Sequence, residues 1–176
     1  DSPISQNLYG IVGRNTGLVA YFSFSVIFLS AALIRNIRSI EAAILAFVAS
    51  ALINITYGFV EHFIGDPIPW TNIYGALLGT FGNPDFAGAF YGMTTATFAS
   101  LVLGYKKKLA WRIAFIALFL ASFACVIFTK TKQGLLVAAI SVFIVLLLFV
   151  LSEVKNKLLT FTISILGTFS FIFTLL

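Results

Sequence analysis

The sequence predicts an all-α integral membrane protein with about six transmembrane helices. First, 60% of the residues are hydrophobic and only 10% are charged, whereas a soluble domain is about 25% charged. Second, the mean hydropathy is +1.06. Third, the apolar residues come in blocks of 17 to 19 residues, close to the roughly 20 residues that cross a hydrocarbon layer of ~30 Å. A buried helix of a soluble protein would instead show a 3.6-residue alternation within each block.

The apolar blocks follow one another after a polar segment, residues 1–17, and the connection 61–85 is the only long loop between them. Because residue 1 is an aspartate and the last block reaches residue 176, we expect residues 1–176 to form a single transmembrane helical domain within a longer chain and a larger bundle. The expected spans are Leu18–Ile34, Ala42–Val60, Phe86–Gly104, Ala110–Phe128, Leu135–Ser152 and Leu158–Leu176.

The basic residues predict the orientation of the chain. Cytoplasmic loops collect Lys and Arg, and eight of the 11 basic residues lie in or beside the first, third and fifth connections. Both chain ends and the 61–85 loop are therefore expected on the extracytoplasmic side. The net charge of +5 then reflects topology, so membrane lipids rather than nucleic acid are the expected partners. A second interpretation of the lysine run 106–108 is a lipid-headgroup site. The eight residues are Arg35, Arg38, Lys106, Lys107, Lys108, Arg112, Lys155 and Lys157.

The most distinctive segment is Gly79–Phe86 (GTFGNPDF), directly before the third span. Its two glycines permit backbone conformations that other residues avoid. Asn83 is a good N-cap, Pro84 suits the first helical position, and Asp85 favours the positive end of the helix dipole. One interpretation is a capped helix start. The other is a cradle for an anion or a glycan phosphate, built from free amides at a helix N-terminus.

A second candidate segment, Thr129–Gly134 (TKTKQG), connects the fourth and fifth spans. Its two lysines and two threonines offer positive charge and hydroxyl donors to a phosphate. The alternative is that both lysines end a helix and extend toward the membrane surface. Arg14, which precedes the first span, has the same two interpretations, a phosphate contact or an interfacial anchor.

Several other chemistries are excluded or disfavoured. Cys125 and His62 are the single cysteine and histidine, so a Cys/His metal cluster is excluded and no metal or cofactor is expected. No GxxxxGK[ST] motif indicates nucleotide hydrolysis. The spans carry almost no ionisable residues, which disfavours secondary active transport. Asn54 and Thr56, the main polar residues of the second span, are expected to hold helices together.

The 61–85 loop carries polar and aromatic residues of its own. Glu61 and Asp66 are interpreted chiefly as residues that solvate the loop, with a carboxylate pair as the alternative. His62 is interpreted as a surface residue. Nearby aromatic residues either contribute to a belt at the membrane interface or line a glycan site; these are Tyr57, Trp70 and Tyr74.

The segment Gly79–Gly88 (GTFGNPDFAG), followed one helix pair later by Thr131–Gly134 (TKQG), resembles the O-antigen ligase and O-antigen polymerase-like membrane proteins. In that family the first motif opens one transmembrane helix, and a second motif with a basic residue opens another helix two spans later. The leader Arg14–Leu18 (RNTGL) also matches, so the resemblance covers about residues 14–151.

The resemblance implies a lipid-carrier glycosyltransferase of the bacterial cytoplasmic (inner) membrane that serves polysaccharide biosynthesis for the cell envelope. Such enzymes move a glycan from undecaprenyl diphosphate to an acceptor on the outer side of the membrane, without a metal. Basic residues hold the diphosphate, which gains negative charge as the sugar–phosphate bond breaks. No catalytic residue is predicted, but the residues expected to contact the diphosphate or the glycan are Lys132, Lys130, Arg14, Thr80, Gly82 and Asn83.

The chain also departs from the family pattern. Lys132 stands where the family has an arginine, which keeps the charge but loses the bidentate fork. The run Gly75–Leu78 has no base where the family has another arginine. The family's histidine lies in a large outer loop, expected after Leu176, so His62 is not given that role. These differences leave open a second hypothesis, a non-catalytic subunit that keeps the scaffold within a membrane complex. A solute transporter or channel is a third, less favoured hypothesis.

Overall fold

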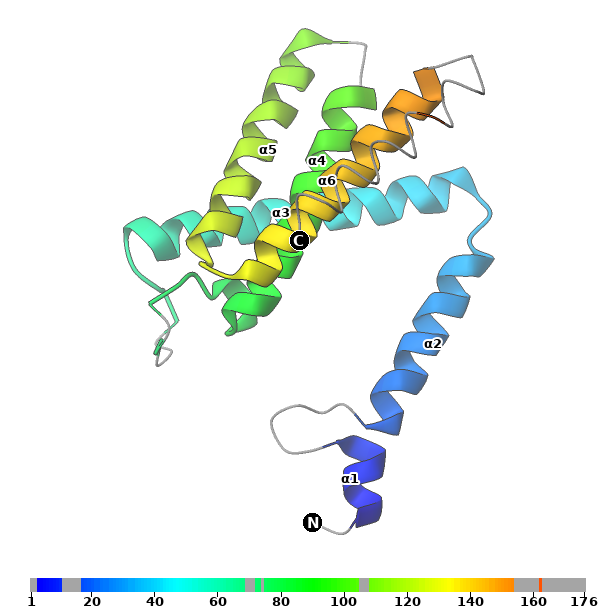
Figure 1. Ribbon diagram of the computed structural model, residues 1–176, viewed down its shortest axis with the longest axis vertical. Helices are drawn as coiled ribbons and strands as arrows, with labels where there is room; N and C mark the ends of the chain where they lie inside the picture. Colours follow the sequence, from blue (N-terminus) through cyan, green and yellow to red (C-terminus); the bar gives the residue numbers. More distant parts are fainter. Residues whose placement is uncertain are drawn as a thin grey trace. The chain divides into compact units, whose positions relative to one another are not determined.

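The computed structural model describes residues 3–10, 17–68, 72–73, 75–104, 108–153 and 162, and within these ranges the chain is helical with no strand. Figure 1 labels the elements in chain order. They are α1 (Pro3–Tyr9), α2 (Leu18–Leu33), α3 (Ile37–Phe63), the 3₁₀ turn η1 (Gly79–Phe81), α4 (Pro84–Gly104), α5 (Leu109–Phe128) and α6 (Lys132–Glu153).

Four of the described helices, α3 to α6, are long and apolar enough to cross a membrane. The predicted class, a helical multi-pass membrane protein, is therefore confirmed at this level. Helix α2 is apolar but has only 16 residues. The predicted span Leu158–Leu176 lies, except for residue 162, outside the described residues. The count of six spans and the outer location of the 61–85 loop stay predictions.

The first connection is shorter than predicted. Arg38 and Glu41 were expected in a loop, but α3 already begins at Ile37 and includes both. The physical reason is Asn36, whose side-chain oxygen accepts a hydrogen bond from the Arg38 amide at 3.0 Å. An Asn at this position satisfies an amide that would otherwise lack a partner in the first turn, so the helix starts earlier than the apolar block.

The chain forms two compact units, residues 1–47 and 48–176. In the first unit α1 contacts α2, and α2 buries none of its side chains. Two hydroxyls of α2 donate to carbonyls one turn earlier in the same helix, Ser23 to Val19 at 2.8 Å and Ser25 to Tyr21 at 2.9 Å. Polar side chains satisfied within their own helix keep an otherwise apolar surface compatible with lipid.

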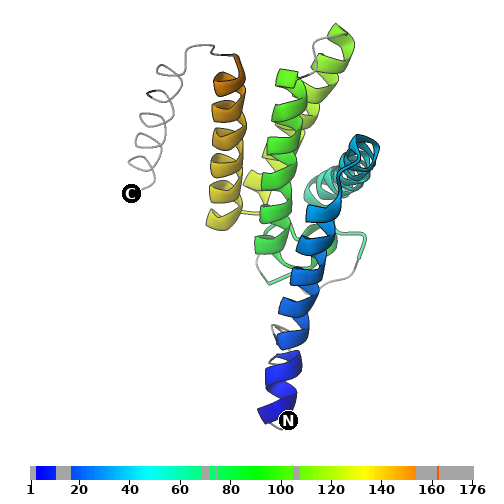
Figure 2. The ribbon, with the colours of Figure 1, turned by 90° about the vertical axis from the view of Figure 1, so that its right-hand side faces the viewer.

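Helix α4 is the centre of the second unit, because it packs extensively against both α5 and α6. Figure 2 shows α4 and α6 running side by side. Tyr91 and Phe98 of α4 are fully buried, as are Cys125 and Val126 of α5. Leu77, from the loop before η1, joins the same cluster, so this loop is anchored to the bundle rather than lying free on its surface.

Small residues allow α4 and α6 to approach closely. Gly88 and Gly92 lie one turn apart on α4 and face Gly134 and Ala138 on α6. A methyl group built on Gly92 would lie 2.9 Å from the Ala138 amide nitrogen, and one built on Gly134 would lie 2.9 Å from the Gly88 Cα. Small residues spaced four apart are a common device for close contact between membrane helices. The spacing of these residues therefore fixes how α4 and α6 dock.

Hydroxyl groups join α4 to α5 within the bundle. The Ser122 Oγ atom of α5 lies 2.5 Å from Thr94 Oγ1 and 3.0 Å from Thr95 Oγ1, and it donates to the Tyr91 carbonyl at 3.0 Å. All four residues are buried. Interhelical hydrogen bonds of this kind contribute about 0.6 kcal/mol each on average, so this cluster secures the α4–α5 register more than it drives association.

Asn54 holds α3 to the rest of the second unit, as predicted. Its backbone carbonyl accepts a hydrogen bond from the Tyr91 hydroxyl at 2.8 Å, and its side-chain oxygen accepts one from Thr80 at 2.6 Å. The same role predicted for Thr56 is wrong. Thr56 is exposed and donates to the Leu52 carbonyl of its own helix at 2.8 Å, so its hydroxyl is satisfied without a neighbouring helix.

Replacing Gly92 with alanine should destabilise the second unit. The added methyl meets backbone that cannot move independently, and overpacking of this kind costs roughly 1–3 kcal/mol, more than the ~1 kcal/mol that alanine gains over glycine inside a helix. Gly104→Ala is the matched control, because nothing lies within 4 Å of a methyl at that position. Unfolding of both variants in mixed micelles measures the difference. Equal or greater stability of Gly92→Ala would contradict close α4–α6 packing.

Candidate functional site

The segment Gly79–Asp85, called the glycine turn below, leads from the loop into α4. Gly79 has φ +58° and Gly82 has φ +65°, a left-handed region that L side chains rarely adopt. The Asn83 side chain accepts a hydrogen bond from the Asp85 amide at 2.8 Å, and Pro84 is the first residue of α4. The predicted helix start, with its cap and its two permissive glycines, is therefore confirmed.

Glu61, near the end of α3, anchors the start of the glycine turn by accepting two backbone hydrogen bonds. One carboxylate oxygen accepts the Leu78 amide and the other accepts the Gly79 amide, each at 2.8 Å. The interpretation of Glu61 as a residue that mainly solvates the loop is wrong. The Leu78 and Gly79 amides, at the start of the 3₁₀ turn, together form a small anion-binding position. The Glu61 carboxylate of the protein itself occupies this position.

The segment Thr129–Gly134, called the lysine turn below, reverses the chain between α5 and α6. Lys130 has φ +55°, the only positive value for a non-glycine residue in the described chain. Thr131 accepts a hydrogen bond from the Gly134 amide at 3.1 Å, as an N-cap does, and α6 begins at Lys132. The interpretation in which both lysines end a helix is therefore wrong for Lys132, which starts one.

The two turns meet at one end of α4 and α6. The Leu77 amide donates to the Phe128 carbonyl at 3.0 Å, and the Lys130 ammonium donates to the Gly75 carbonyl at 2.6 Å. One turn into α4, a methyl built on Gly88 would lie 2.5 Å from the Thr131 hydroxyl oxygen. Two motifs about 50 residues apart in the sequence are thus joined by close packing at Gly88, and hydrogen bonds attach the loop residues just before the glycine turn to the end of α5 and to Lys130.

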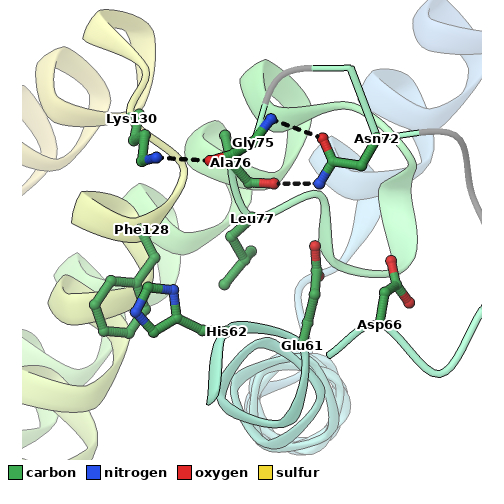
Figure 3. A pocket seen from close by; sticks show the side chains of 9 residues that line it. All are labelled: Glu61, His62, Asp66, Asn72, Gly75, Ala76, Leu77, Phe128 and Lys130. Carbon is green, nitrogen blue, oxygen red and sulfur yellow. Dashed lines mark hydrogen bonds between the residues drawn. The ribbon is translucent and has the colours of Figure 1, made fainter. Parts of the chain in front are cut away.

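A cleft of about 440 Å³ opens beside this junction, within the 300–1,000 Å³ typical of ligand pockets. His62 and Phe128 stack on one another, with ring centroids 3.7 Å apart and an interplanar angle of 4°. In the view of Figure 3 these rings lie on one side of Leu77, and the Glu61 carboxylate lies on the other. The cleft is lined by Glu61, His62, Asp66, Asn72, Gly75, Ala76, Leu77, Phe128 and Lys130.

Asp66 has two differently placed oxygens. Oδ1 accepts hydrogen bonds from the Tyr57 hydroxyl and, at 2.9 Å, from the Ile68 amide. Oδ2 is buried and has no hydrogen-bond partner in the described part of the chain. A buried carboxylate oxygen without a partner is costly and calls for an explanation. The predicted role of Asp66 in solvating the loop does not account for this oxygen.

The predicted site residues differ in their surroundings. Lys130 lines the cleft. Lys132 is exposed, and its ammonium has no hydrogen-bond or ion-pair partner among the described residues. The Thr80 hydroxyl is committed to Asn54, while Gly82 and Asn83 shape the glycine turn. Arg14, Trp70 and Tyr74 lie outside the described residues.

Sequence reasoning missed the roles of Glu61 and Phe128. The one available signal for Glu61 was an acidic residue at the end of an apolar span, followed by a glycine-rich loop whose amides need acceptors. No pattern indicated that Phe128 stacks on His62, because this contact depends on how α3 and α5 pack. In the described part of the chain, no group of three or more His, Cys, Asp or Glu side chains is placed to hold a metal ion.

Comparison of the chain with models of known protein families, with curated proteins and with solved structures finds no match. The resemblance to the O-antigen ligase and polymerase-like proteins therefore rests on the motif residues alone. The geometry adds one independent fact, namely that the two motifs lie together in space although neither the motif spacing nor the charge pattern requires their contact.

Replacing Glu61 with glutamine should loosen the glycine turn. A carboxamide offers one acceptor oxygen and turns an NH₂ donor toward the second backbone amide, so one bond to a charged acceptor is lost, which costs about 1.5–3 kcal/mol. The measurement is the free energy of unfolding, together with hydrogen exchange at the Leu78 and Gly79 amides. Glu41→Gln, an exposed site on the same helix, is the control. Unchanged protection of both amides would refute this role of Glu61.

Proposed function

We propose that this chain belongs to an O-antigen ligase- or polymerase-like glycosyltransferase. It transfers a glycan from undecaprenyl diphosphate to an acceptor at the outer side of the bacterial cytoplasmic membrane. The observation that carries the proposal is the close packing of Gly88, the last residue of the Gly79–Gly88 motif, against Thr131 and Gly134 of the lysine turn at one end of α4 and α6. These are the two motifs through which the sequence resembles that family, and a cleft that Lys130 lines opens beside the place where they meet.

Lys132 is the residue best suited to a diphosphate. It is the first residue of α6, where the helix dipole places partial positive charge, so its ammonium is unfavourable there unless an anion is present. A diphosphate gains charge–charge attraction from the ammonium and hydrogen bonds from those amides of the first helical turn that Thr131 does not already cap. The same charge stabilises the leaving group as the sugar–phosphate bond breaks.

The glycine turn supports this site by shape rather than by direct phosphate binding. Its Gly79 amide is already bonded to Glu61, and the Asp85 amide is bonded to Asn83. Gly82 and Asn83 fix the direction in which α4 begins, and thereby the position of the lysine turn packed against it. Thr80 ties the turn to α3 through Asn54.

The reaction itself is a substitution at the anomeric carbon of the donor. The acceptor hydroxyl oxygen forms a bond to that carbon, while the bond between the carbon and the diphosphate oxygen breaks. Undecaprenyl diphosphate leaves with the electron pair, and the acceptor hydroxyl gives its proton to a base or to solvent. Positioning of both reactants and stabilisation of the departing charge are the contributions required of the protein.

A second candidate, a non-catalytic scaffold subunit, is favoured by one observation. The groups that converge at the turns are largely satisfied by the chain itself, with Glu61 on two amides and Lys130 on the Gly75 carbonyl. A site whose donors are internally paired presents fewer groups to a substrate. Lys132 separates the two candidates, because it is exposed and its ammonium has no hydrogen-bond or ion-pair partner among the described residues.

Lys132→Ala should reduce surface-glycan transfer by at least about tenfold, within the range lost when one charge-stabilising donor is removed. Lys132→Arg should retain most transfer, because it keeps the charge and adds a fork suited to phosphate. The assay follows the lipid-linked donor and the transferred glycan in cells whose chromosomal gene is deleted. Lys108→Ala, an exposed lysine before α5, is the control. Full transfer by Lys132→Ala would favour the scaffold subunit.

The outward location of the site has its own test. In a Cys125→Ala background, Gln133→Cys marks the start of α6 and Lys108→Cys marks the start of α5, both at exposed positions. The two starts are separated by a helix of 20 residues, about 30 Å at 1.5 Å per residue. A membrane-impermeant maleimide should label Gln133→Cys in intact spheroplasts and Lys108→Cys only after permeabilisation. The reverse pattern would place the site in the cytoplasm and exclude the proposed donor.

A further inference from the structure

The cleft beside the two turns has the wrong charge for a phosphate. Among the described residues, its lining carries the carboxylates of Glu61 and Asp66 against the single ammonium of Lys130. Even with a positive charge on His62, the net charge of these lining residues would rise only to zero. A diphosphate inside the cleft would face two carboxylates at short range with little compensating charge. The cleft therefore suits a ligand without negative charge.

The geometry of the lining matches a neutral ring that bears hydroxyl groups. The stacked rings of His62 and Phe128 provide a flat surface, against which the apolar face of a sugar ring can pack. Around it lie carboxylate and carbonyl acceptors, and the Lys130 ammonium has further N–H donors beyond the one bonded to Gly75. Hydroxyl groups both donate and accept hydrogen bonds, so they can satisfy both kinds of partner.

Asp66 gives this match a specific point of contact. Its Oδ1 atom is held by Tyr57 and by the Ile68 amide, which fixes the orientation of the carboxylate at the edge of the cleft. Its Oδ2 atom remains a buried acceptor without a partner in the described chain. Because Oδ2 is covered in the empty cleft, a sugar hydroxyl supplies the missing donor only once the atoms that cover this oxygen shift, and it then recovers part of the cost of burying it.

We propose that this cleft binds a neutral sugar ring of the glycan, while the diphosphate stays outside it at Lys132. That the sugar belongs to a lipid-linked glycan rests on the proposed function. The binding of a sugar ring as such rests on the cleft alone. The position is suitable for both, because Lys130 lines the cleft and Lys132 follows it by two residues.

The test measures sugar binding to the full chain in nanodiscs of phosphatidylethanolamine and phosphatidylglycerol. Saturation-transfer NMR is recorded with a panel of methyl glycosides of neutral hexoses, deoxyhexoses and N-acetylhexosamines, and with inorganic pyrophosphate as competitor. We expect at least one glycoside to bind with millimolar affinity and pyrophosphate not to displace it. Absence of binding across the panel, or displacement by pyrophosphate, overturns the inference.

Asp66→Asn is the sharpest variant, because an asparagine oxygen can still accept from Tyr57 and Ile68 while an NH₂ group replaces the unpartnered acceptor. It should weaken glycoside binding at least fivefold. His62→Ala, at an exposed position, should weaken binding by removing part of the flat surface. Asp85→Asn, a carboxylate outside the cleft, should leave it unchanged. Thermal unfolding of each variant confirms that it is folded. Equal affinity of Asp66→Asn and wild type overturns the inference.

This outcome is separable from that of the proposed function. If Lys132→Ala abolishes glycan transfer but no glycoside binds, the result supports the transferase proposal and refutes sugar binding in the cleft. If a glycoside binds through Asp66 while Lys132→Ala transfers glycan normally, the result supports sugar binding in the cleft and refutes the proposed role of Lys132. Lys132→Ala should also bind the glycoside with unchanged affinity, since its ammonium lies outside the lining.

Discussion

The close contact between Gly88 of α4 and Gly134 of α6 is the constraint on which the rest of the second unit depends. Side chains larger than hydrogen at these positions would separate the helices, since a methyl on Gly134 would lie 2.9 Å from the Gly88 Cα. Both glycines lie within the first two turns of their helices. Their contact therefore brings together the two turns that precede those helices, and everything proposed for the site follows from this docking.

Glu61 determines what the glycine turn is able to do. Backbone amides at the start of a helical turn attract anions, and on sequence grounds the turn had phosphate binding as one of its two interpretations. Because a carboxylate from α3 already occupies the Leu78 and Gly79 amides, the turn becomes a rigid connector between α3 and α4. Binding chemistry then falls to groups next to the turn, namely the cleft lining and the start of α6.

The sequence predicted those features that depend on local chemistry. Helices α4 and α5 begin and end within about two residues of the expected spans, because apolar length and caps such as Asn83 act within one element. Contacts between distant elements were not predictable. The Glu61 acceptor role, the Tyr57–Asp66 bond and the His62–Phe128 stack each require the packing of α3 against the loop or α5. The prediction that Thr56 holds helices together was wrong for the same reason, because the sequence does not show which way its side chain faces.

The two lysines of the lysine turn show how backbone conformation separates similar residues. Two residues apart, they have equal charge and equal reach, and the sequence offers no reason to treat them differently. The left-handed conformation at Lys130 ends α5 and turns its ammonium toward Gly75, whereas Thr131 caps a new helix that starts at Lys132. Lys130 thus lines the cleft and is bonded to the loop before the glycine turn, whereas Lys132 stands at the positive end of a helix dipole. A negative ligand is attracted to the second, since only there do side-chain charge and backbone dipole add without a carboxylate in the same lining.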